Sequence, residues 1–390
     1  MKCNAWTLAL LGAGIVSLPS VTQAEERTNA VLSALSATTI SGYVDTSAQW
    51  NMGTGNLGVP TYAFGGTSKA DGFNLNVVKL TLEKALEPTD SWAAGYKVDL
   101  IAGPDANVLN TSSTGSSSDF GVKQAYVALR TPVGNGLDFK LGVFDTIIGY
   151  EVFESGNNPN FTRSYGYTIE PTTHTGALMS YQFADWISAN FGIANTVGPT
   201  INGRAFYDKA ESYKTYMGTI TLTAPEDMGA LAGSTLTAGV INGFNESTPS
   251  PAGSTPGDQT SWYIGATFST PVTGLKVGAS YDYLGISDQS LREAGWANAT
   301  AIYASYQLTE KMTLYARGEY ASSDTPSLFG AEEVVAVTTT LQYDLWKNVL
   351  SRLEFRWDHA TDGTEPYGGE TTAGGKDNSF ILAANLIYKF

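Results

Sequence analysis

The sequence predicts an all-β protein, a 16-stranded antiparallel up-and-down transmembrane β-barrel with short periplasmic turns and long extracellular loops. Three observations predict this fold. Apolar and polar residues alternate with period two in segment after segment, which is the pattern of a strand with one apolar face. The connectors between these segments are short and long in turn, as in barrels whose two rims differ. Glycine and aromatic residues are abundant and charge is sparse, which argues against a helical or a disordered chain.

Composition narrows the classes of function. The chain has 390 residues, with 22 Lys and Arg against 37 Asp and Glu, and a net charge of −15. An acidic balance argues against nucleic-acid binding, because phosphate groups require a basic surface. Only 15% of the residues are charged, whereas about 25% is typical of soluble domains.

The first 24 residues predict a secretory signal peptide. Lys2 precedes an apolar stretch over residues 5–18, and small residues near Ala24 are typical of a cleavage site. The apolar stretch is shorter than the roughly 18 residues that a membrane anchor needs. Residues 25–37 are expected to be a lead-in, either a short helix or disordered, and residues 38–390 the barrel. Cleavage would leave no cysteine, which excludes disulfides and thiolate metal sites.

Sixteen segments carry the alternation and are the predicted strands. They are residues 39–51, 73–86, 91–101, 121–131, 136–145, 174–184, 186–195, 213–224, 233–243, 260–270, 274–284, 298–309, 311–321, 333–345, 348–358 and 379–390. Most have the length of a tilted bilayer crossing, which takes ~9–11 residues. Short connectors such as 132–135 alternate with long ones such as 52–72, and a Greek-key sandwich has no reason to sort its loops in this way.

The last segment shows the clearest alternation. Its apolar face consists of Phe380, Leu382, Ala384, Leu386, Tyr388 and Phe390. A chain that ends on an aromatic residue of such a strand resembles the C-terminal signal by which bacterial outer-membrane barrels are recognised for assembly. We therefore predict that Tyr388 and Phe390 act as an assembly signal.

The polar faces of the predicted strands would line a water-filled lumen. The charged residues at these positions are Asp45, Lys79, Glu83, Lys97, Asp99, Arg130, Lys140, Arg317, Glu319, Arg352, Glu354, Arg356 and Asp358. Because both signs face one narrow space, they would create a transverse field instead of a simple charge filter. We expect a weak cation preference, since loop charges are screened within about 8–10 Å.

No pattern of catalytic or metal-ligating residues is present. The two histidines, His174 and His359, lie outside any metal-binding spacing, and the sequence contains neither a nucleophile elbow nor a phosphate-binding loop. The sequence therefore predicts no enzyme, no cofactor and no metal site.

The connector 146–173 differs in kind from the other long loops, because it combines charged residues, tyrosines and apolar pairs such as Ile147–Ile148. Its charged residues, with the histidine that follows it, are Glu151, Glu154, Arg163, Glu170 and His174. A barrel of this size encloses an aqueous lumen. We expect the loop to fold inward, to pair its charged residues across the lumen and to form the constriction. The alternative is a solvated loop outside the mouth.

Residues 123–183 carry a series of recognisable motifs. They are Gln-Ala-Tyr-Val at 124–127, Pro-x-Gly-x-Gly-Leu at 132–137, Gly-x-Phe-x4-Gly-Tyr-Glu at 142–151, the Asn-Asn to Phe-x-Arg-Ser-Tyr run at 157–165, and His-Thr-Gly at 174–176. In these motifs the chain resembles the OmpL-like beta-barrel porin-2 family of bacterial outer membranes. The barrel layout extends the resemblance over most of residues 38–390. The resemblance implies an outer-membrane channel without catalytic residues.

The predicted function is that of an outer-membrane porin, a passive diffusion channel for small hydrophilic solutes or ions. Two alternatives remain: an outer-membrane barrel with a plugged lumen that serves as an adhesin, envelope anchor or binding protein, and a soluble secreted β-sandwich. The expected partners are the lipid bilayer of the outer membrane, the barrel-assembly machinery and small hydrophilic solutes, and not nucleic acid. A homotrimer is suggested by analogy with porins alone.

Overall fold

The computed structural model describes residues 37–53, 55–87, 91–113, 118–205, 211–246, 257–287, 294–324 and 328–390. The predicted signal peptide, and the predicted lead-in apart from Ala37, lie outside these residues. Contacts divide the chain into two units, Met1–Ile40 and Ser41–Phe390, and the second unit contains the barrel described below.

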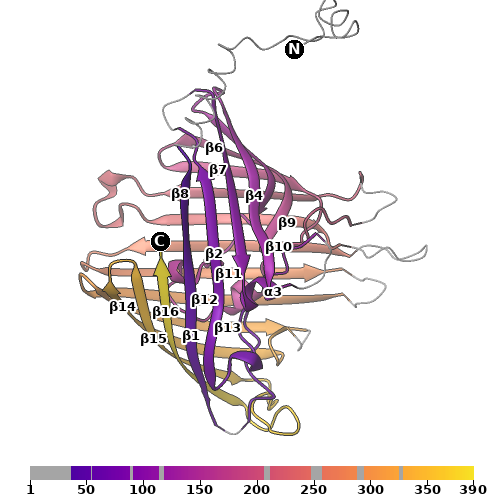
Figure 1. The fold of residues 1–390 in the computed structure, drawn as a ribbon, viewed down its shortest axis with the longest axis vertical. Helices are drawn as coiled ribbons and strands as arrows, with labels where there is room; N and C mark the ends of the chain where they lie inside the picture. Colours follow the sequence, from indigo (N-terminus) through magenta and orange to yellow (C-terminus); the bar gives the residue numbers. More distant parts are fainter. Residues whose placement is uncertain are drawn as a thin grey trace, which may run out of the picture. The chain divides into compact units, whose positions relative to one another are not determined.

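Sixteen strands of the described chain close into one barrel, as the sequence predicts. Each strand pairs with its neighbours along the chain, and β1 pairs antiparallel with β16 (Figure 1). The strand bounds are β1 (Thr39–Met52), β2 (Gly72–Lys84), β3 (Ala93–Ala102), β4 (Phe120–Thr131), β5 (Leu137–Asp145), β6 (Thr173–Ala184), β7 (Ile187–Ala194), β8 (Thr215–Thr223), β9 (Thr235–Phe244), β10 (Asp258–Ser269), β11 (Leu275–Ile286), β12 (Gly295–Thr309), β13 (Met312–Ser323), β14 (Glu333–Trp346), β15 (Val349–Ala360) and β16 (Asn378–Lys389). All lie within three residues of the predicted bounds.

Alternation along the strands separates an outer face from an inner face. On β15, Leu353 and Phe355 are exposed, whereas Arg352 and Arg356 are buried. On β5, Leu141 is exposed and its neighbour Lys140 points to the opposite face, because successive side chains alternate along a strand. The apolar side chains therefore form the outer surface of the barrel, which is the surface that meets lipid in outer-membrane barrels.

The barrel closes between the first strand and the chain end. Gly42 and Phe390 exchange two backbone hydrogen bonds of 3.0 Å each. A Cβ on Gly42 would lie 2.2 Å from the carbonyl oxygen of Lys79 and 2.6 Å from the Phe390 ring. Only glycine at this position allows the terminal aromatic ring and the neighbouring strand to approach so closely.

Short helices lie in connectors where the sequence predicts only loops. They are α3 (Pro104–Leu109), α4 (Tyr165–Ile169) and the 3-10 turns η1 (Thr67–Lys69), η2 (Ser155–Asn157) and η4 (Glu226–Leu231). Such short segments show no helical periodicity, so only their ends can signal them. Pro104 begins α3, and Asn110 ends it with a φ of 58°, a left-handed conformation that asparagine tolerates. No helix in the described ranges is long and apolar enough to cross a membrane.

Buried apolar side chains of the described residues form three clusters. The first cluster includes Tyr165 and Phe329. The second includes Phe153 and Phe64, and the third includes Ile148 and Phe144. The connector 146–173 contributes to all three clusters, Tyr165 and Ile169 to the first, Phe153 and Tyr167 to the second, and Ile148 to the third. This connector therefore packs among side chains from several parts of the barrel wall.

Candidate functional site

The predicted loop 146–173, whose last residue is the first residue of β6, lies against the inner face of the wall. Its helix α4 packs on β11, β12 and β13. Ser164 caps this helix, because its Oγ accepts a hydrogen bond from Tyr167 N at 3.1 Å. A serine cap and apolar residues that can be buried explain why the segment folds compactly.

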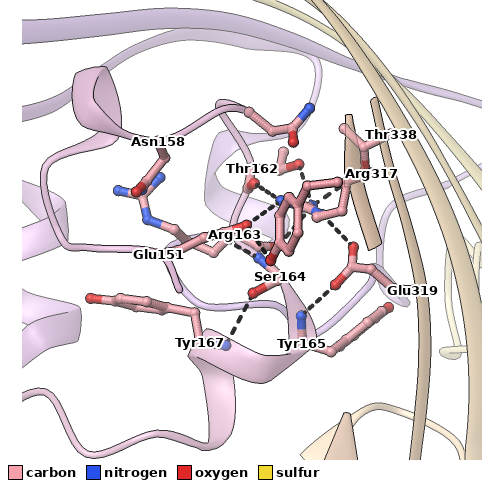
Figure 2. A network of polar contacts seen from close by, with 12 residues as sticks. Glu151, Asn158, Thr162, Arg163, Ser164, Tyr165, Tyr167, Arg317, Glu319 and Thr338 are labelled. Carbon is pink, nitrogen blue, oxygen red and sulfur yellow. Dashed lines mark hydrogen bonds and ion pairs between the residues drawn. The ribbon is translucent and has the colours of Figure 1, made fainter. Parts of the chain in front are cut away.

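Arg317 of β13 forms the centre of the contacts between this loop and the wall (Figure 2). Its Nη1 donates to Glu151 Oε1 at 2.8 Å, and its Nε donates to Glu319 Oε2 at 2.7 Å. The same guanidinium donates to the carbonyl oxygens of Thr162 at 2.8 Å and Arg163 at 3.2 Å. The three charged side chains are buried, so these partners must offset the loss of their hydration.

Carboxylates of the wall also bind the backbone of the loop. Glu354 of β15 accepts hydrogen bonds from Phe161 N at 2.5 Å and from Thr162 N at 2.9 Å. Glu319 accepts one from Tyr165 N at 2.7 Å (Figure 2). The wall thus satisfies backbone donors of an irregular segment that would otherwise be buried without partners.

Two arginines of β15 hold the same segment. Arg356 lies 2.8 Å from Asp358 and donates to the carbonyl oxygen of Arg163 at 2.7 Å. Arg352 donates to Ser155 twice, to the carbonyl oxygen at 2.8 Å and to Oγ at 2.7 Å. Arg317, Arg352 and Arg356, three of the arginines that the sequence assigns to the pore wall, therefore bind the loop and are not open to the lumen.

Glu154 binds a different part of the wall. Its Oε1 lies 2.5 Å from Lys79 Nζ of β2 and 3.2 Å from Lys123 Nζ of β4. Lys79 also lies 3.0 Å from Asp99, and Lys123 lies 2.5 Å from Asp145. We call these five residues the Glu154 cluster. Burial alone would raise the pKa of Glu154, but Lys123 and Lys79 outweigh it and lower the pKa to about 2.

Members of the Glu154 cluster line two cavities. One, of 260 Å³, is lined by Lys79, Glu154 and the terminal Phe390. The other, of 170 Å³, is lined by Lys123 and Asp145. Members of one buried apolar cluster line both spaces as well, Tyr43 and Ile387 the first, and Phe153 and Tyr167 the second.

Asp45 and Glu170 each contact a partner that the sequence did not single out. Asp45 of β1 is buried and accepts a hydrogen bond from Ser155 Oγ of the loop at 2.6 Å. Glu170, at the end of α4, lies so close to Gly149 of the same loop that a Cβ on this glycine would come within 2.2 Å of Glu170 Oε2.

Two of the predicted loop residues contribute differently from expectation. The prediction that Arg163 pairs across the lumen is wrong, because its guanidinium donates to the carbonyl oxygens of Phe161 and Phe153 in its own loop. Only its carbonyl group meets the wall. His174 is the second residue of β6 and is buried beside the Phe144 ring, with Nδ1 3.5 Å from the Thr196 carbonyl oxygen and Nε2 3.4 Å from Thr146 Oγ1.

The remaining predicted wall residues are partly exposed. Glu83 and Lys97 lie 3.5 Å apart, and Arg130 lies 2.7 Å from Asp138. Lys140 lies over a tyrosine ring, with 5.0 Å between Nζ and the ring centroid. These side chains leave part of the inner face polar and accessible.

Lys123 is a site residue that sequence reasoning missed. The pairing of β3 with β4 is irregular at this position. Asp99 faces Gln124, but the next residue, Leu100, faces Val122, so one residue of β4 is skipped. The extra residue breaks the period of two, so an alternation analysis cannot assign Lys123 to a face. In the described part of the chain, no group of three or more His, Cys, Asp and Glu side chains could hold a metal ion.

Comparisons with known proteins agree with this architecture. The family described as "Putative beta-barrel porin-2, OmpL-like" matches residues 37–390. No curated protein matches the chain in sequence. Among solved structures, the chain is similar to an anion-selective porin from Comamonas acidovorans, with a TM-score of 0.58 at 12% identity, covering 90% of this chain and 99% of the other. It is also similar to Salmonella typhi OmpF in complex with daunomycin, with a TM-score of 0.57 at 12% identity over 90% and 97% of the two chains.

A third similar structure is an in-vitro folded outer-membrane protein of Vibrio cholerae, OmpT in a trimer form. Its TM-score is 0.55 at 14% identity, and the match covers 90% of this chain and 99% of the other. At these identities the likenesses establish the fold alone.

Proposed function

The chain belongs to the OmpL-like beta-barrel porin-2 family of the outer membrane, and from this premise we propose that it is a porin through which small hydrophilic solutes or ions diffuse passively. A closed barrel with an apolar outer face and a partly polar inner face is suited to this task. The proposal assigns the protein no catalytic role, because a diffusion channel requires only a shaped, hydrated path.

The observation that carries the proposal in detail is the position of Glu154. We infer that loop 146–173 narrows the lumen and that solutes pass between the loop and the wall of β2–β5. The Glu154 cluster is polar and its members line two cavities, whereas Arg317 and Glu354 lie where the loop is bound tightly to the wall. Charged groups that face a narrow path control which ions enter it.

A barrel with a plugged lumen is the second candidate function. The observation in its favour is that the loop contributes to three buried apolar clusters, since such packing resists displacement by water. In this candidate the protein would act as an adhesin, an envelope anchor or a binding protein, and the same loop would be a permanent plug.

A homotrimer fits the proposal, because the similar Vibrio cholerae protein is described in a trimer form. Insertion by the barrel-assembly machinery, with Tyr388 and Phe390 as its signal, is part of the same proposal. The exposed rings of both residues at the chain end support it.

Single-channel recording in planar bilayers tests the proposal. The purified barrel should give discrete conductance steps, whereas a plugged barrel should give none. Glu154→Gln should shift the reversal potential toward anions, because it leaves Lys79 and Lys123 with one fewer carboxylate. Glu354→Gln is the matched control, since it removes the same charge where the loop is bound tightly to the wall, and it should shift the potential less.

A further inference from the structure

An apolar cavity of 480 Å³ lies at the rim of short turns, on the outer surface of the barrel. Leu222 of β8 and Leu236 of β9 line it and are direct partners across these two strands. Phe268 of β10 and Trp186, in the turn between β6 and β7, line it from the neighbouring strands. The cavity is therefore outside the lumen and separate from loop 146–173.

The connector between β8 and β9 bounds the cavity at the rim. This rim connector, residues 224–234, is the longest connector on the side of the short turns and contains η4. It contacts β10, where Ser269 N donates to Ser234 Oγ at 3.0 Å. Met228 and Leu231 of η4 line the cavity. A segment of the chain that is bound to the wall therefore presents apolar side chains toward the outer surface.

The side chains around the cavity do not fill it. The six large apolar ones are each 38–51% exposed: Trp186, Leu222, Met228, Leu231, Leu236 and Phe268. The same outer face continues along β8 and β10 with Ile220 and Ile264, which are also exposed. This face meets lipid in outer-membrane barrels. The cavity is therefore continuous with the lipid-facing surface, where apolar atoms that enter it gain contacts that the protein alone leaves unmade.

Acidic side chains border the cavity. Asp185 is the neighbour of the lining Trp186, and Glu226 and Asp227 belong to η4. All three are exposed, and none has an ion-pair partner within 4.0 Å among the described side chains. The segments 185–186 and 224–234 contain no lysine or arginine. Because tryptophan rings favour the level of the lipid headgroups, these carboxylates lie where a headgroup with a positive charge finds a partner.

We propose that this cavity binds an acyl chain of a phospholipid whose headgroup carries a protonated amine. The acyl chain lies against Leu222 and Leu236 beside η4, and the amine meets the carboxylates of Glu226 and Asp227. A flexible chain of methylene groups can enter a cavity beside the rim connector, whereas the convex wall of a second barrel cannot. Short turns are periplasmic in outer-membrane barrels, so the lipid comes from the periplasmic leaflet. The site does not depend on conduction through the lumen.

Native mass spectrometry of the whole barrel in detergent tests the site, because it reads bound lipid and oligomeric mass together. The probes are phosphatidylethanolamine and phosphatidylglycerol with identical acyl chains. The wild-type barrel should bind phosphatidylethanolamine saturably and more tightly than phosphatidylglycerol. Leu231→Ser should weaken the binding of both lipids about tenfold, since an apolar contact of the acyl chain is lost. Glu226→Gln combined with Asp227→Asn should weaken phosphatidylethanolamine alone, by roughly threefold, as expected for exposed ion pairs.

Leu308→Ser is the matched control, because Leu308 is exposed to a similar degree near the short-turn end of β12, away from the rim connector. It should leave both affinities unchanged. Met228→Ser repeats the test of the acyl-chain contact in a second position. The proposal is overturned if both rim-connector variants, Leu231→Ser and Met228→Ser, keep the wild-type affinity for phosphatidylethanolamine, or if wild type binds phosphatidylglycerol as tightly. It also fails if Leu231→Ser changes the oligomeric mass and not the bound lipid, since a second copy would then cover the cavity.

Discussion

Arg317 Nη1 lies 2.8 Å from Glu151 Oε1, and neither side chain is exposed to solvent. Arg317→Met should therefore destabilise the barrel, because the change leaves Glu151 buried without its cation and Glu319 with Arg356 at the longer distance of 3.9 Å. Breaking one partner of a buried pair costs about 3–5 kcal/mol. Urea-dependent unfolding in lipid vesicles measures this cost. Adding Glu151→Gln to Arg317→Met should recover part of it, and an unchanged urea midpoint in the single variant would contradict the contact.

The strands of the barrel wall could be predicted from the sequence better than the path of the loop inside the barrel. The exposed Phe355 and the buried Arg356 follow directly from a period of two, since adjacent side chains on a strand face opposite ways. The pairing of Glu151 with Arg317 could not be predicted, because these residues are 166 positions apart. Their contact depends on the path of the loop through the lumen, which local patterns do not encode.

Arg163 shows why residue type alone misassigns a site. A charged loop residue is expected to seek an opposite charge, yet its guanidinium donates to the carbonyl oxygens of Phe161 and Phe153. An irregular buried loop has backbone acceptors that no strand or helix satisfies, and a five-donor side chain meets several of them at once. Sequence patterns reveal neither that demand nor its location.

Shortening the loop by removing residues 155–162 should raise the single-channel conductance. This segment includes Ser155, Phe161 and Thr162, which bind Arg352 and Glu354 of the wall. Its removal empties part of the lumen and leaves the closed strand ladder unchanged. Deleting the exposed residues 370–373 of another long connector should leave conductance near the wild-type value. Equal conductance in both deletion variants would show that loop 146–173 does not limit flow.

Leu141→Arg should hinder insertion, whereas Lys140→Gln should not. Leu141 is 47% exposed on the outer face of β5, and an arginine on the lipid face near the bilayer midplane costs about 2–4 kcal/mol. Lys140 lies on the inner face over a tyrosine ring, so its replacement affects only the lumen. The folded fraction in lipid vesicles, read from heat-modifiable gel mobility, distinguishes the two variants. Equal folding of both would mean that the assignment of faces is wrong.

Deleting Phe390 should lower the amount of barrel in the outer membrane. The residue completes two backbone hydrogen bonds with Gly42 and places its ring against that glycine. As the proposed assembly signal, it should affect insertion in cells more than refolding into vesicles, where no assembly machinery acts. Quantifying the barrel in isolated outer membranes, beside refolding yields, separates the two effects. Normal outer-membrane levels after the deletion would remove the signalling role.

Glu154 should stabilise the barrel at neutral pH and cease to do so in strong acid. Lys123 and Lys79 lower its pKa to about 2 in the folded barrel, although burial opposes them, whereas an unfolded glutamate titrates near about 4.3. A carboxyl group with a lowered pKa contributes its full stability above the unfolded value, and this contribution is lost as pH falls toward the folded value.

The difference in unfolding free energy between wild type and Glu154→Gln measures that contribution. It should be constant above about pH 5.5, shrink as pH falls through the interval between the two pKa values, and vanish near about pH 2. Glu83→Gln serves as the comparison, because its partner Lys97 lies 3.5 Å away at a more exposed position; exposed pairs contribute about 0–1 kcal/mol. If the difference in unfolding free energy between wild type and Glu154→Gln stays constant over the whole acidic range, Lys79 and Lys123 do not stabilise the charged form of Glu154.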